Sequence, residues 1–294
     1  MPTLDPAQPD ANPRASSVRP IAPSDVVVFP GPLDCRLDRE DFALEPTHPT
    51  DVVIKTIYTV VSAGTEEALY RGTEAWSNHP IKPGYGAVGE VIALGDQVTD
   101  LSLGDLVFTY GNHATYIRAK RMLLSVPDGL DPRVAVFARM AQVSFTALRV
   151  AEAALGDAVA VIGLGSVGNI AAQLFRLAGC TVIGIDIMPS RLRLAEQCGI
   201  EHTVDARTED VHARLREITD GNMCRSVVEA SGVPDQALAA ARLAGKNGEV
   251  ILLGSPRGEF TQNPVNLLNH AHLWDRGCVT FKGAHEWRLP DHAS

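Results

Sequence analysis

The hydrophobic pattern divides the chain into two parts that meet near residue 132. Before that point, apolar residues form short runs separated by glycine, proline, asparagine and aspartate, the residues that favour turns. The runs predict β-strands at 25–29, 51–61, 86–94, 105–110, 113–119 and 122–127. Closely spaced short strands with Gly-Asp turns are typical of a compact, barrel-like β domain.

After residue 132 the pattern first takes a helical spacing and then alternates between strands and helices. In an Ala-rich segment, Val136, Met140, Val143 and Ala147 recur as on one face of a helix. Strands are expected at 158–163, 180–186, 202–206, 225–230, 249–254 and 278–283, with helices at 166–178, 190–199, 208–218 and 235–244. Most of these strands are nearly continuous aliphatic runs, which indicates parallel strands covered by helices on both faces.

The expected fold class is therefore α/β plus β. A β-barrel domain over 25–131 precedes a doubly wound parallel sheet over 132–286. Residues 1–24 contain several prolines, no aromatic residue and no apolar periodicity, so we expect a disordered extension there.

Composition limits the partners and the compartment. The net charge of −9 argues against a nucleic-acid partner, because phosphate binding depends on Lys and Arg. No apolar run is long enough for a membrane span, and no signal peptide is visible at the N-terminus. The five cysteines include no C-x-x-C pair, so a disulfide framework is not indicated. We expect a cytoplasmic protein that acts on a small molecule.

The clearest motif is a glycine loop between the first strand and the first helix of the second part. Gly163, Gly165 and Gly168 have the G-x-G-x-x-G spacing, and Asp186 ends the next strand. The glycines permit a tight turn, close approach of the pyrophosphate and close helix packing, while the helix N-terminus attracts phosphate. The predicted dinucleotide loop consists of Gly163, Leu164, Gly165, Ser166, Val167 and Gly168. The alternative is a glycine turn in a flavodoxin-like or methyltransferase sheet.

Asp186 also bears on the choice of dinucleotide. Its carboxylate can accept hydrogen bonds from both ribose hydroxyls, whereas a 2′-phosphate there would meet a like charge. The next basic residue is Arg191, which we take as a candidate cofactor contact but which is also consistent with a solvated charge on the next helix. We therefore expect NAD(H), with NADP(H) less favoured.

Four segments share patterns with one known family. YTVVSAGTEEALYRG (58–72) is similar to a segment ending in C-G-T/S-D, and HPIKPGYGAVGEVIALGDQVTDLSLGDLVF (79–108) to P-x-x-P-G-H-E-x-x-G-x-V. VVEASGVPDQAL (227–238) is similar to an E-x-x-G turn, and EVILLGSP (249–256) to a strand ending beside the nicotinamide. Together they resemble the medium-chain dehydrogenase/reductase superfamily, which includes the zinc-type alcohol dehydrogenases. The resemblance implies a GroES-like β-barrel catalytic domain followed by a Rossmann domain.

The resemblance also implies further cofactor contacts. They are Ser231 and Gly232 in the E-x-x-G turn, Gly254 and Ser255 after the later strand, and Thr146 on the helix that bridges the two domains. The hydroxyls of Ser144 and Thr146 could reach the nicotinamide carboxamide or a ribose hydroxyl. The alternative is that these helical polar residues face backbone or solvent.

Two zinc ligands of the family are missing. Ala63 stands where zinc members have the cysteine before Gly-Thr-Asp, and Tyr85 stands where they have the histidine after Pro-Gly. The four-cysteine structural lobe is also absent. An open zinc site needs three protein ligands, so we expect no metal. The pattern is loosely similar to a zinc-less branch that includes hydroxyethyl bacteriochlorophyllide dehydrogenases.

Without zinc, hydride transfer requires hydrogen-bond donors or a proton relay. The catalytic candidates are Tyr85, Thr65, Glu66 and His113. Each has a simpler interpretation: Tyr85 as filler of the lost zinc site, Thr65 as a helix cap, Glu66 as a helix N-terminal charge, and His113 as a hydrogen-bonded residue at a strand end.

Three functions remain open at this point. The first is a zinc-free NAD(H)-dependent alcohol/carbonyl oxidoreductase, the second a C=C reductase of the quinone or enoyl type, and the third a dinucleotide-binding protein without turnover. The resemblance implies a homodimer through the last strand, 278–283, since exposed sheet edges invite pairing. Residues 287–294 are expected to begin a return to the catalytic domain that the sequence does not complete.

Overall fold

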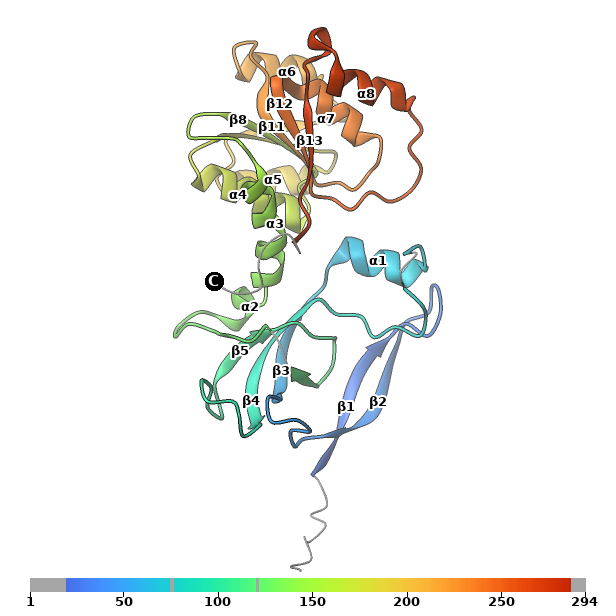
Figure 1. Ribbon diagram of the computed structural model, residues 1–294, viewed down its shortest axis with the longest axis vertical. Coiled ribbons are helices and arrows are strands. Elements are labelled where there is room, and N and C mark those ends of the chain that lie inside the picture. Colours follow the sequence, from blue (N-terminus) through green and yellow to red (C-terminus); the bar gives the residue numbers. More distant parts are fainter. Residues whose placement is uncertain (1–19, 75–76, 120–121, 287–294) are drawn as a thin grey trace, which may run out of the picture. The chain divides into compact units, whose positions relative to one another are not determined.

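A computed structural model describes residues 20–74, 77–119 and 122–286. The chain divides between Pro132 and Arg133 into two compact units, one residue after the expected boundary. Figure 1 shows the elements of both units.

The first unit is built from two antiparallel sheets. Its elements are β1 (Ile21–Val28), β2 (Arg36–Ala43), β3 (Val52–Val60), α1 (Ala63–Arg71), β4 (Gly86–Leu94), β5 (Leu106–Thr109), β6 (Tyr116–Ala119) and β7 (Leu124–Ser125). β1 and β2 form a hairpin, and the other strands form a sheet in the order β6-β3-β4-β5-β7 (Figure 1). The prediction that this part of the chain consists mainly of β-strands is confirmed.

A cluster of buried apolar residues packs along the five-stranded sheet. It is formed by fully or nearly fully buried residues of alternating strand positions: Val52, Ile54, Ala87, Val91, Val107, Ile117 and Ala119. The hairpin is joined to the sheet by the segment 113–115, because Val27 N donates to His113 O over 2.9 Å and Thr56 N donates to Thr115 O over 2.9 Å.

The start of the ordered chain differs from the expectation. We expected residues 1–24 to be disordered, but β1 begins at Ile21, so residues 21–24 belong to a strand. Pro23 obscured this strand in the sequence, since proline lowers the expectation of a strand; β1 tolerates it in a two-stranded hairpin. Residues 1–19 and 287–294, where an extension and a return segment were expected, lie outside the described residues.

The second unit is a six-stranded parallel sheet covered by helices. Its elements are α2 (Pro132–Ala135), which begins at the boundary, α3 (Ala138–Val150), β8 (Ala158–Ile162), α4 (Ser166–Leu177), β9 (Thr181–Asp186), α5 (Pro189–Gln197), β10 (His202–Asp205), α6 (Val211–Ile218), β11 (Cys224–Glu229), α7 (Gln236–Leu243), β12 (Ala244–Leu252), α8 (Pro264–His272), the short 3₁₀ helix η1 (Trp274–Arg276) and β13 (Thr280–Gly283). All the expected strands and helices are present, and α8 is an addition.

The strand order β10-β9-β8-β11-β12-β13 is that of a doubly wound fold. Right-handed crossovers place α4 and α5 on one face of the sheet, and α6, α7 and α8 on the other. Contacts of α3 with α4, and of α7 with α6 and α8, agree with these two layers. The aliphatic runs read in the sequence are the central strands, in which Val159, Ala160 and Val161 of β8 are fully buried.

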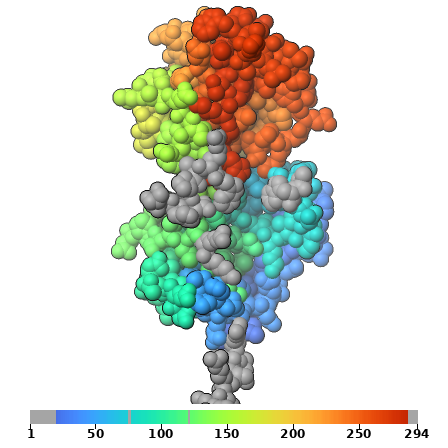
Figure 2. Space-filling model, viewed as in Figure 1, coloured from blue at the N-terminus to red at the C-terminus, as the bar shows by residue number. Residues whose placement is uncertain are grey.

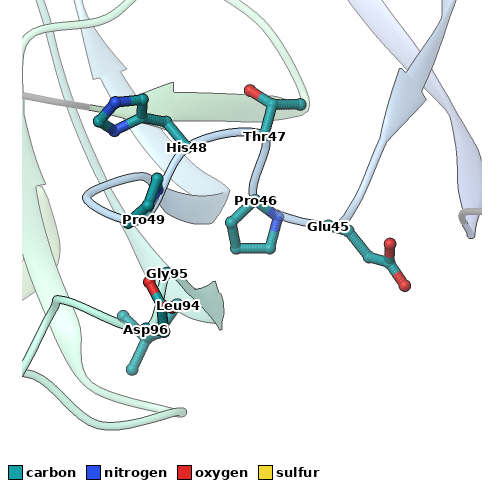
Figure 3. Close-up of a pocket in the computed structure, with 8 residues that line it drawn as sticks. All are labelled: Glu45, Pro46, Thr47, His48, Pro49, Leu94, Gly95 and Asp96. Carbon is teal, nitrogen blue, oxygen red and sulfur yellow. The ribbon is translucent and has the colours of Figure 1, made fainter. Parts of the chain in front are cut away.

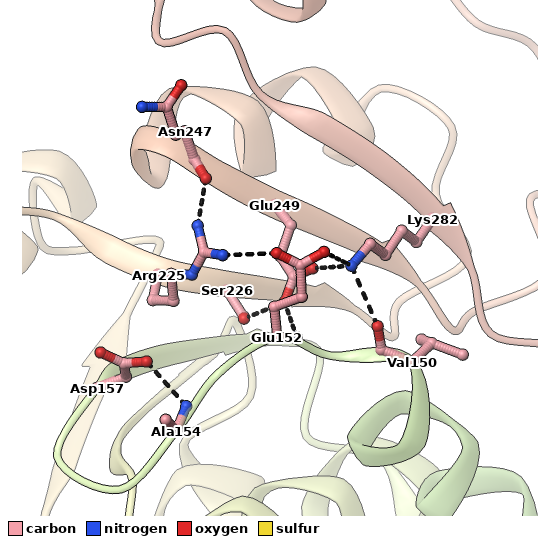
Figure 4. Close-up of polar contacts among 9 residues, drawn as sticks. All are labelled: Val150, Glu152, Ala154, Asp157, Arg225, Ser226, Asn247, Glu249 and Lys282. Atoms are coloured by element: carbon pink, nitrogen blue, oxygen red, sulfur yellow. Dashed lines mark hydrogen bonds and ion pairs between the residues drawn. The ribbon is translucent and has the colours of Figure 1, made fainter.

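A buried ionic cluster fastens the segment after α3 to this sheet (Figure 4). Glu249 of β12 is buried; its Oε1 accepts from Glu152 N over 2.7 Å, and its Oε2 lies 2.6 Å from Lys282 Nζ. Lys282 also donates to Glu152 Oε1 over 2.7 Å and to Val150 O, at the end of α3, over 3.3 Å. Burial lowers the pKa of Lys282, but the hydrogen bonds and charges of Glu152 and Glu249 outweigh it and raise that pKa overall.

In the described ranges, no helix has the length and apolar character needed to cross a membrane. All five cysteines are free thiols. Cys35 is exposed, whereas Cys224 is fully buried in β11, and burial raises the pKa of its thiol to about 12.

Candidate functional site

The loops that follow β8, β11 and β12 meet at the carboxyl edge of the parallel sheet. A Cβ atom at Gly163 would lie 2.9 Å from Ser231 N, and one at Gly254 would lie 2.4 Å from Gly232 N. β8 and β11 are neighbours whose connections run in opposite directions, so these loops lie at the topological switch point. Ligands of doubly wound sheets bind at that crevice.

The glycine loop has the form needed for a phosphate. Gly163 has a φ of +88°, and a Cβ at Gly168 would lie 1.8 Å from Gly163 O, so both positions require glycine. Gly165 precedes the first residue of α4, and nothing lies within 4 Å of a Cβ built there. The open space therefore lies directly at the N-terminus of α4, where N–H groups without intrahelical partners attract anions.

The remaining loop residues have different environments. Ser166 is exposed at the start of α4, and Val167 is half-buried. Leu164 is buried and its side chain packs at Gly184 of β9, so it contributes its backbone to the loop rather than its side chain. Ser231 and Ser255 are exposed, and Gly232 and Gly254 are half-buried beside them. These residues fit a dinucleotide whose phosphates lie at α4.

Asp186 ends β9 and is held by backbone groups of the same edge. Its Oδ2 accepts from Leu164 N over 2.7 Å, and its Oδ1 accepts from Met188 N over 2.8 Å. Arg191 Nη1, on α5, lies 3.5 Å from Asp186 Oδ2. Arg191 is thus half-exposed on the next helix, as one interpretation expected, but its charge is paired with Asp186.

Sequence reasoning did not single out Glu229, which ends β11 between the other loops. Its carboxylate is buried and accepts hydrogen bonds from Ser231 N over 2.8 Å, from Ser231 Oγ and from Gly232 N over 3.2 Å. Burial raises the pKa of Glu229 above its ordinary value near 4.5, although these hydrogen bonds lower it. The E-x-x-G pattern was the available signal, since the glutamate shapes the turn that its glycine completes.

The polar residues of α3 turn toward backbone. Thr146 is buried and its hydroxyl donates to Gln142 O over 3.2 Å, one turn earlier. Ser144 is also buried, and its hydroxyl lies 2.9 Å from Met140 O and 2.8 Å from Val167 O. The contact with Val167 joins α3 to the glycine loop. A direct cofactor contact of Thr146 stays a prediction.

In the first unit, Glu66, His113 and Thr59 form a continuous hydrogen-bonded chain. His113 Nε2 lies 2.8 Å from Glu66 Oε2, and His113 Nδ1 lies 2.7 Å from Thr59 Oγ1. The other carboxylate oxygen, Glu66 Oε1, accepts from Ser62 N over 2.8 Å. The side chains of His113 and Glu66 are only 11% and 9% exposed, so they interact with each other rather than with bulk water.

The backbone around His113 is fixed on both sides. His113 N donates to Pro83 O over 2.9 Å, and His113 O accepts from Val27 N over 2.9 Å. A Cβ at Gly84 would lie 2.3 Å from the Cα of Asn112, so these two loops touch. The imidazole is therefore presented by a rigid backbone, before β6 begins.

Two other catalytic candidates lie in the same part of the unit. Tyr85 precedes β4, which pairs with β3 so that Gly86 lies opposite Val60. Thr65 is half-buried in the first turn of α1, whose N-cap is Ser62, so the interpretation of Thr65 as the cap is wrong. Glu66 lies in that first turn too, and it is both a helix N-terminal charge and a partner of His113.

The expectation that this chain holds no zinc stays a prediction. Ala63 has no donor atom and is the first residue of α1. Among the residues that the structure describes, no group of three His, Cys, Asp or Glu side chains is placed to hold a metal ion. Glu66 and His113 are two side chains of this kind, and they are hydrogen-bonded to each other.

The pocket of about 360 Å³ shown in Figure 3 lies elsewhere. It is lined by Glu45, Pro46, Thr47, His48, Pro49, Leu94, Gly95 and Asp96. These residues adjoin the end of the paired strands β3 and β4 at which Val52 lies opposite Leu94. Thr59 and Tyr85 adjoin the other end, at which Val60 lies opposite Gly86. At roughly 3.3 Å per residue, the two ends are about 25–30 Å apart, so this pocket is separate from the His113 chain.

Family models match both units. Residues 48–142 match a model described as alcohol dehydrogenase GroES-like domain, and residues 166–288 match one described as zinc-binding dehydrogenase. An uncharacterized zinc-type alcohol dehydrogenase-like protein of Haemophilus influenzae is 30% identical over 271 residues, which cover 81% of this chain and 79% of that protein. The chain belongs to the medium-chain dehydrogenase/reductase superfamily. It is an alcohol dehydrogenase-like oxidoreductase, and its GroES-like and Rossmann domains are those the sequence predicted.

Two further comparisons complete the picture. The D-guloside 3-dehydrogenase of Escherichia coli is 32% identical over 210 residues, which cover 70% of this chain and 59% of that protein. A crystal structure of a putative zinc-binding dehydrogenase from Sinorhizobium meliloti 1021 bound to NADP superposes with a TM-score of 0.76. It is 22% identical, and the match covers 90% of this chain and 84% of that one. Similarity at that level shows the shared fold.

Proposed function

We propose that this chain is an NAD(H)-dependent oxidoreductase that interconverts an alcohol and a carbonyl by hydride transfer without catalytic zinc. The chemistry that the cofactor supplies is acceptance or donation of the hydride by its nicotinamide ring. The chain itself supplies the binding groups for the cofactor and the acid/base groups for the proton.

The Rossmann unit supplies the binding groups. The free N–H groups at the start of α4, beside Gly165 and Ser166, would hold the pyrophosphate, and Asp186 would accept from the adenosine ribose. The turns at Ser231–Gly232 and Gly254–Ser255 would line the rest of the dinucleotide. The NADP-bound relative of the same fold supports a nicotinamide dinucleotide as the class of ligand.

The choice of NAD(H) over NADP(H) rests on two charges. A 2′-phosphate beside Asp186 would meet a carboxylate, which is unfavourable in a partly desolvated site. Arg191 could offset that charge only if it were available, and its guanidinium is paired with Asp186. The pairing therefore favours an unphosphorylated ribose.

The observation that carries the proposal is the chain of Glu66, His113 and Thr59 in the catalytic unit. An imidazole placed between a carboxylate and a hydroxyl is a common arrangement for moving a proton. An alcohol that loses a hydride must also lose its hydroxyl proton. The imidazole can take this proton, and in the reverse direction it can return the proton to the carbonyl oxygen.

Absence of zinc from the reaction is part of the proposal. Zinc would polarise the substrate oxygen and lower the barrier by several kcal/mol. Its two expected ligands are replaced by Ala63 and Tyr85. The phenol of Tyr85 can donate a hydrogen bond to a carbonyl oxygen and so supply part of that stabilisation.

The test combines dinucleotide binding, turnover and metal content on the whole chain. We expect NADH to bind more tightly than NADPH. We also expect the chain to oxidise NADH with a panel of carbonyl compounds, or to reduce NAD⁺ with a panel of alcohols that includes sugar alcohols and glycosides. Turnover should persist after dialysis against a chelator. One tightly held zinc per chain, or turnover that disappears with the chelator and returns with zinc, would refute zinc independence. Reduction of enones but not of carbonyls would favour the C=C reductase instead.

Replacement of Tyr85 by Phe tests the role of the phenol. We expect a loss of about 10²-fold in kcat if the phenol donates to the substrate oxygen. Tyr110→Phe is the matched control, because Tyr110 lies in the same unit and is also half-buried. An unchanged rate for Tyr85→Phe would leave Tyr85 as a packing residue.

A further inference from the structure

We propose that Thr59 is the catalytic residue through which the His113–Glu66 pair exchanges a proton with the substrate hydroxyl. This inference rests on the proposed function and adds a residue that the sequence patterns do not mark. Thr59 is the second-last residue of strand β3, and its hydroxyl is 2.7 Å from His113 Nδ1.

Both imidazole nitrogens of His113 have hydrogen-bond partners. Nε2 faces the Glu66 carboxylate at 2.8 Å, and Nδ1 faces the Thr59 hydroxyl. A substrate therefore finds no open ring nitrogen in this arrangement. Glu66 is buried with both carboxylate oxygens engaged, whereas Thr59 is half-buried. The Thr59 hydroxyl is thus the end of the chain that a substrate can reach.

The direction of the two hydrogen bonds of His113 leaves the Thr59 oxygen able to accept a proton. A carboxylate can only accept, so His113 Nε2 carries the proton of that bond. Neutral His113 then has a lone pair on Nδ1, which accepts the proton of the Thr59 hydroxyl. This leaves the Thr59 oxygen with lone pairs free to accept a proton from a second hydroxyl. Hydroxyl, imidazole and carboxylate are connected in the same order as in a hydrolase triad. Here the three hydrogen-bonded groups would transfer a proton.

During alcohol oxidation, the substrate O–H proton moves to Thr59 Oγ1 while the Thr59 proton moves to His113 Nδ1. The substrate C–H bond breaks, its electron pair leaves with the hydrogen as hydride to the nicotinamide, and the C=O bond forms. The resulting imidazolium is stabilised by the Glu66 carboxylate and later releases one proton to water. Carbonyl reduction follows the same route in reverse.

The strand pairing supports a common target for Thr59 and Tyr85. Thr59 lies opposite Ala87, and Tyr85 lies two residues before Ala87, in the bend that leads into β4. The two residues are therefore near neighbours at this end of the paired strands. The phenol and the threonine hydroxyl would therefore act on the same substrate oxygen, one as donor and the other as proton relay.

The first test needs no turnover. Nitrogen-15 NMR of the histidine side chains reports which ring nitrogen carries the proton. We expect neutral His113 to be protonated on Nε2, and the Nδ1 resonance to shift in Thr59→Val. The matched control is Thr56→Val, because Thr56 lies on the same strand and its hydroxyl has no partner among the described residues. A proton on Nδ1 in the unmodified protein would overturn the relay.

The second test is kinetic. Thr59→Val should lower kcat by about 10²-fold, the scale of an acid/base contribution, and leave the dinucleotide KM unchanged. Thr59→Ser should retain most of the rate because it keeps the hydroxyl, and Thr56→Val should retain all of it. Full kcat in Thr59→Val overturns the relay but leaves the proposed function intact. A wild-type chain that binds NADH but turns over no alcohol or carbonyl overturns both.

Discussion

Asp186 carries two tasks in one carboxylate. It holds the backbone of the glycine loop through Leu164 N, and it neutralises Arg191. The cofactor preference and the shape of the loop are therefore coupled at a single residue. A change at Asp186 alters the charge presented to the ribose and at the same time releases the guanidinium beside it.

Asp186→Ser should shift the preference toward NADP(H). The like charge disappears, and the unpaired Arg191 becomes available for a 2′-phosphate. We expect the ratio of the NADPH and NADH dissociation constants to change by about tenfold, which corresponds to ~1.4 kcal/mol. Fluorescence titration with both cofactors measures the ratio. Asp157→Ser is the control, since Asp157 also accepts from a backbone N–H but precedes β8. An unchanged ratio would remove Asp186 as the selecting residue.

Glu229 predicts a pH dependence of stability. Its pKa is raised by burial, so the folded protein binds the proton more tightly than the unfolded chain does. The stability that this proton contributes is complete below the ordinary pKa near 4.5, and it is lost as the pH rises through the folded-state value. Wild type should therefore lose stability relative to Glu229→Gln as the pH increases above about 4.5.

Urea unfolding of wild type and Glu229→Gln at several pH values measures this difference. The comparison concerns the slope with pH, because the amide also alters the hydrogen bonds from Ser231 and Gly232. The exposed Glu201→Gln serves as the control variant. A difference between wild type and Glu229→Gln that stays constant with pH would contradict the raised pKa.

Several residues of the candidate site could be named from the sequence, but their connections could not. Glu66 and His113 were both candidates, yet they are 47 positions apart, and only the folded sheet brings them to 2.8 Å. Thr59 was not singled out, because threonine is common in β-strands and its presence in a β-rich run does not indicate a function. The glycine loop was easier to predict, since its residues are adjacent and its function depends on the backbone.

At the scale of elements, the ionic cluster of Figure 4 joins β12, β13 and the segment after α3. Glu249 is buried, and Lys282 is the cation closest to its Oε2, at 2.6 Å. Lys282 also lies near the C-terminal end of α3 through its bond to Val150 O, a favourable position for a positive charge. One lysine thus connects an edge strand to the helix layer.

Lys282→Met should be destabilising because it leaves the Glu249 carboxylate buried without its cation. We expect a loss of about 2–3 kcal/mol in the free energy of unfolding, less than for a fully buried pair since Lys282 is partly exposed. Denaturant titration measures the loss, and Glu152→Gln, on the exposed arm of the cluster, should be less destabilising than Lys282→Met because exposed ion pairs contribute little. The double variant Lys282→Met/Glu249→Gln should recover part of the loss. Equal losses in Lys282→Met and Glu152→Gln would argue against the buried pair.

Elements with a regular hydrophobic period were predicted well, and elements without one were missed. β8 and β9 are aliphatic runs with Gly and Asp at their ends, and both lie within a residue or two of the expected bounds. β2 has mostly charged and exposed side chains, and only its pairing with β1 makes it a strand. α8 is a short helix that buries none of its residues, and the sequence did not predict it.

At the scale of the whole molecule, β13 ends the parallel sheet with an open edge. It pairs with β12 on one side, and no strand of the described residues pairs with it on the other. The elements just before it also present apolar side chains to solvent: Val265, Leu268, Leu273 and Trp274. In Figure 2 this orange-red part of the chain forms visible surface of the second unit. An open edge beside exposed apolar residues favours association.

We propose that two chains pair through β13 about a two-fold axis, which joins two sheets edge to edge and repeats the same contacts on both chains. Light scattering should then give twice the chain mass of 31.5 kDa. Trp274→Ser should weaken the dimer, because Trp274 is 61% exposed in the isolated chain and begins η1, the last element before β13. Leu155→Ser is the matched control, since Leu155 is 84% exposed in the loop before β8, a central strand away from the β13 edge. A mass of one chain for wild type, or equal weakening by both variants, would argue against pairing through this edge.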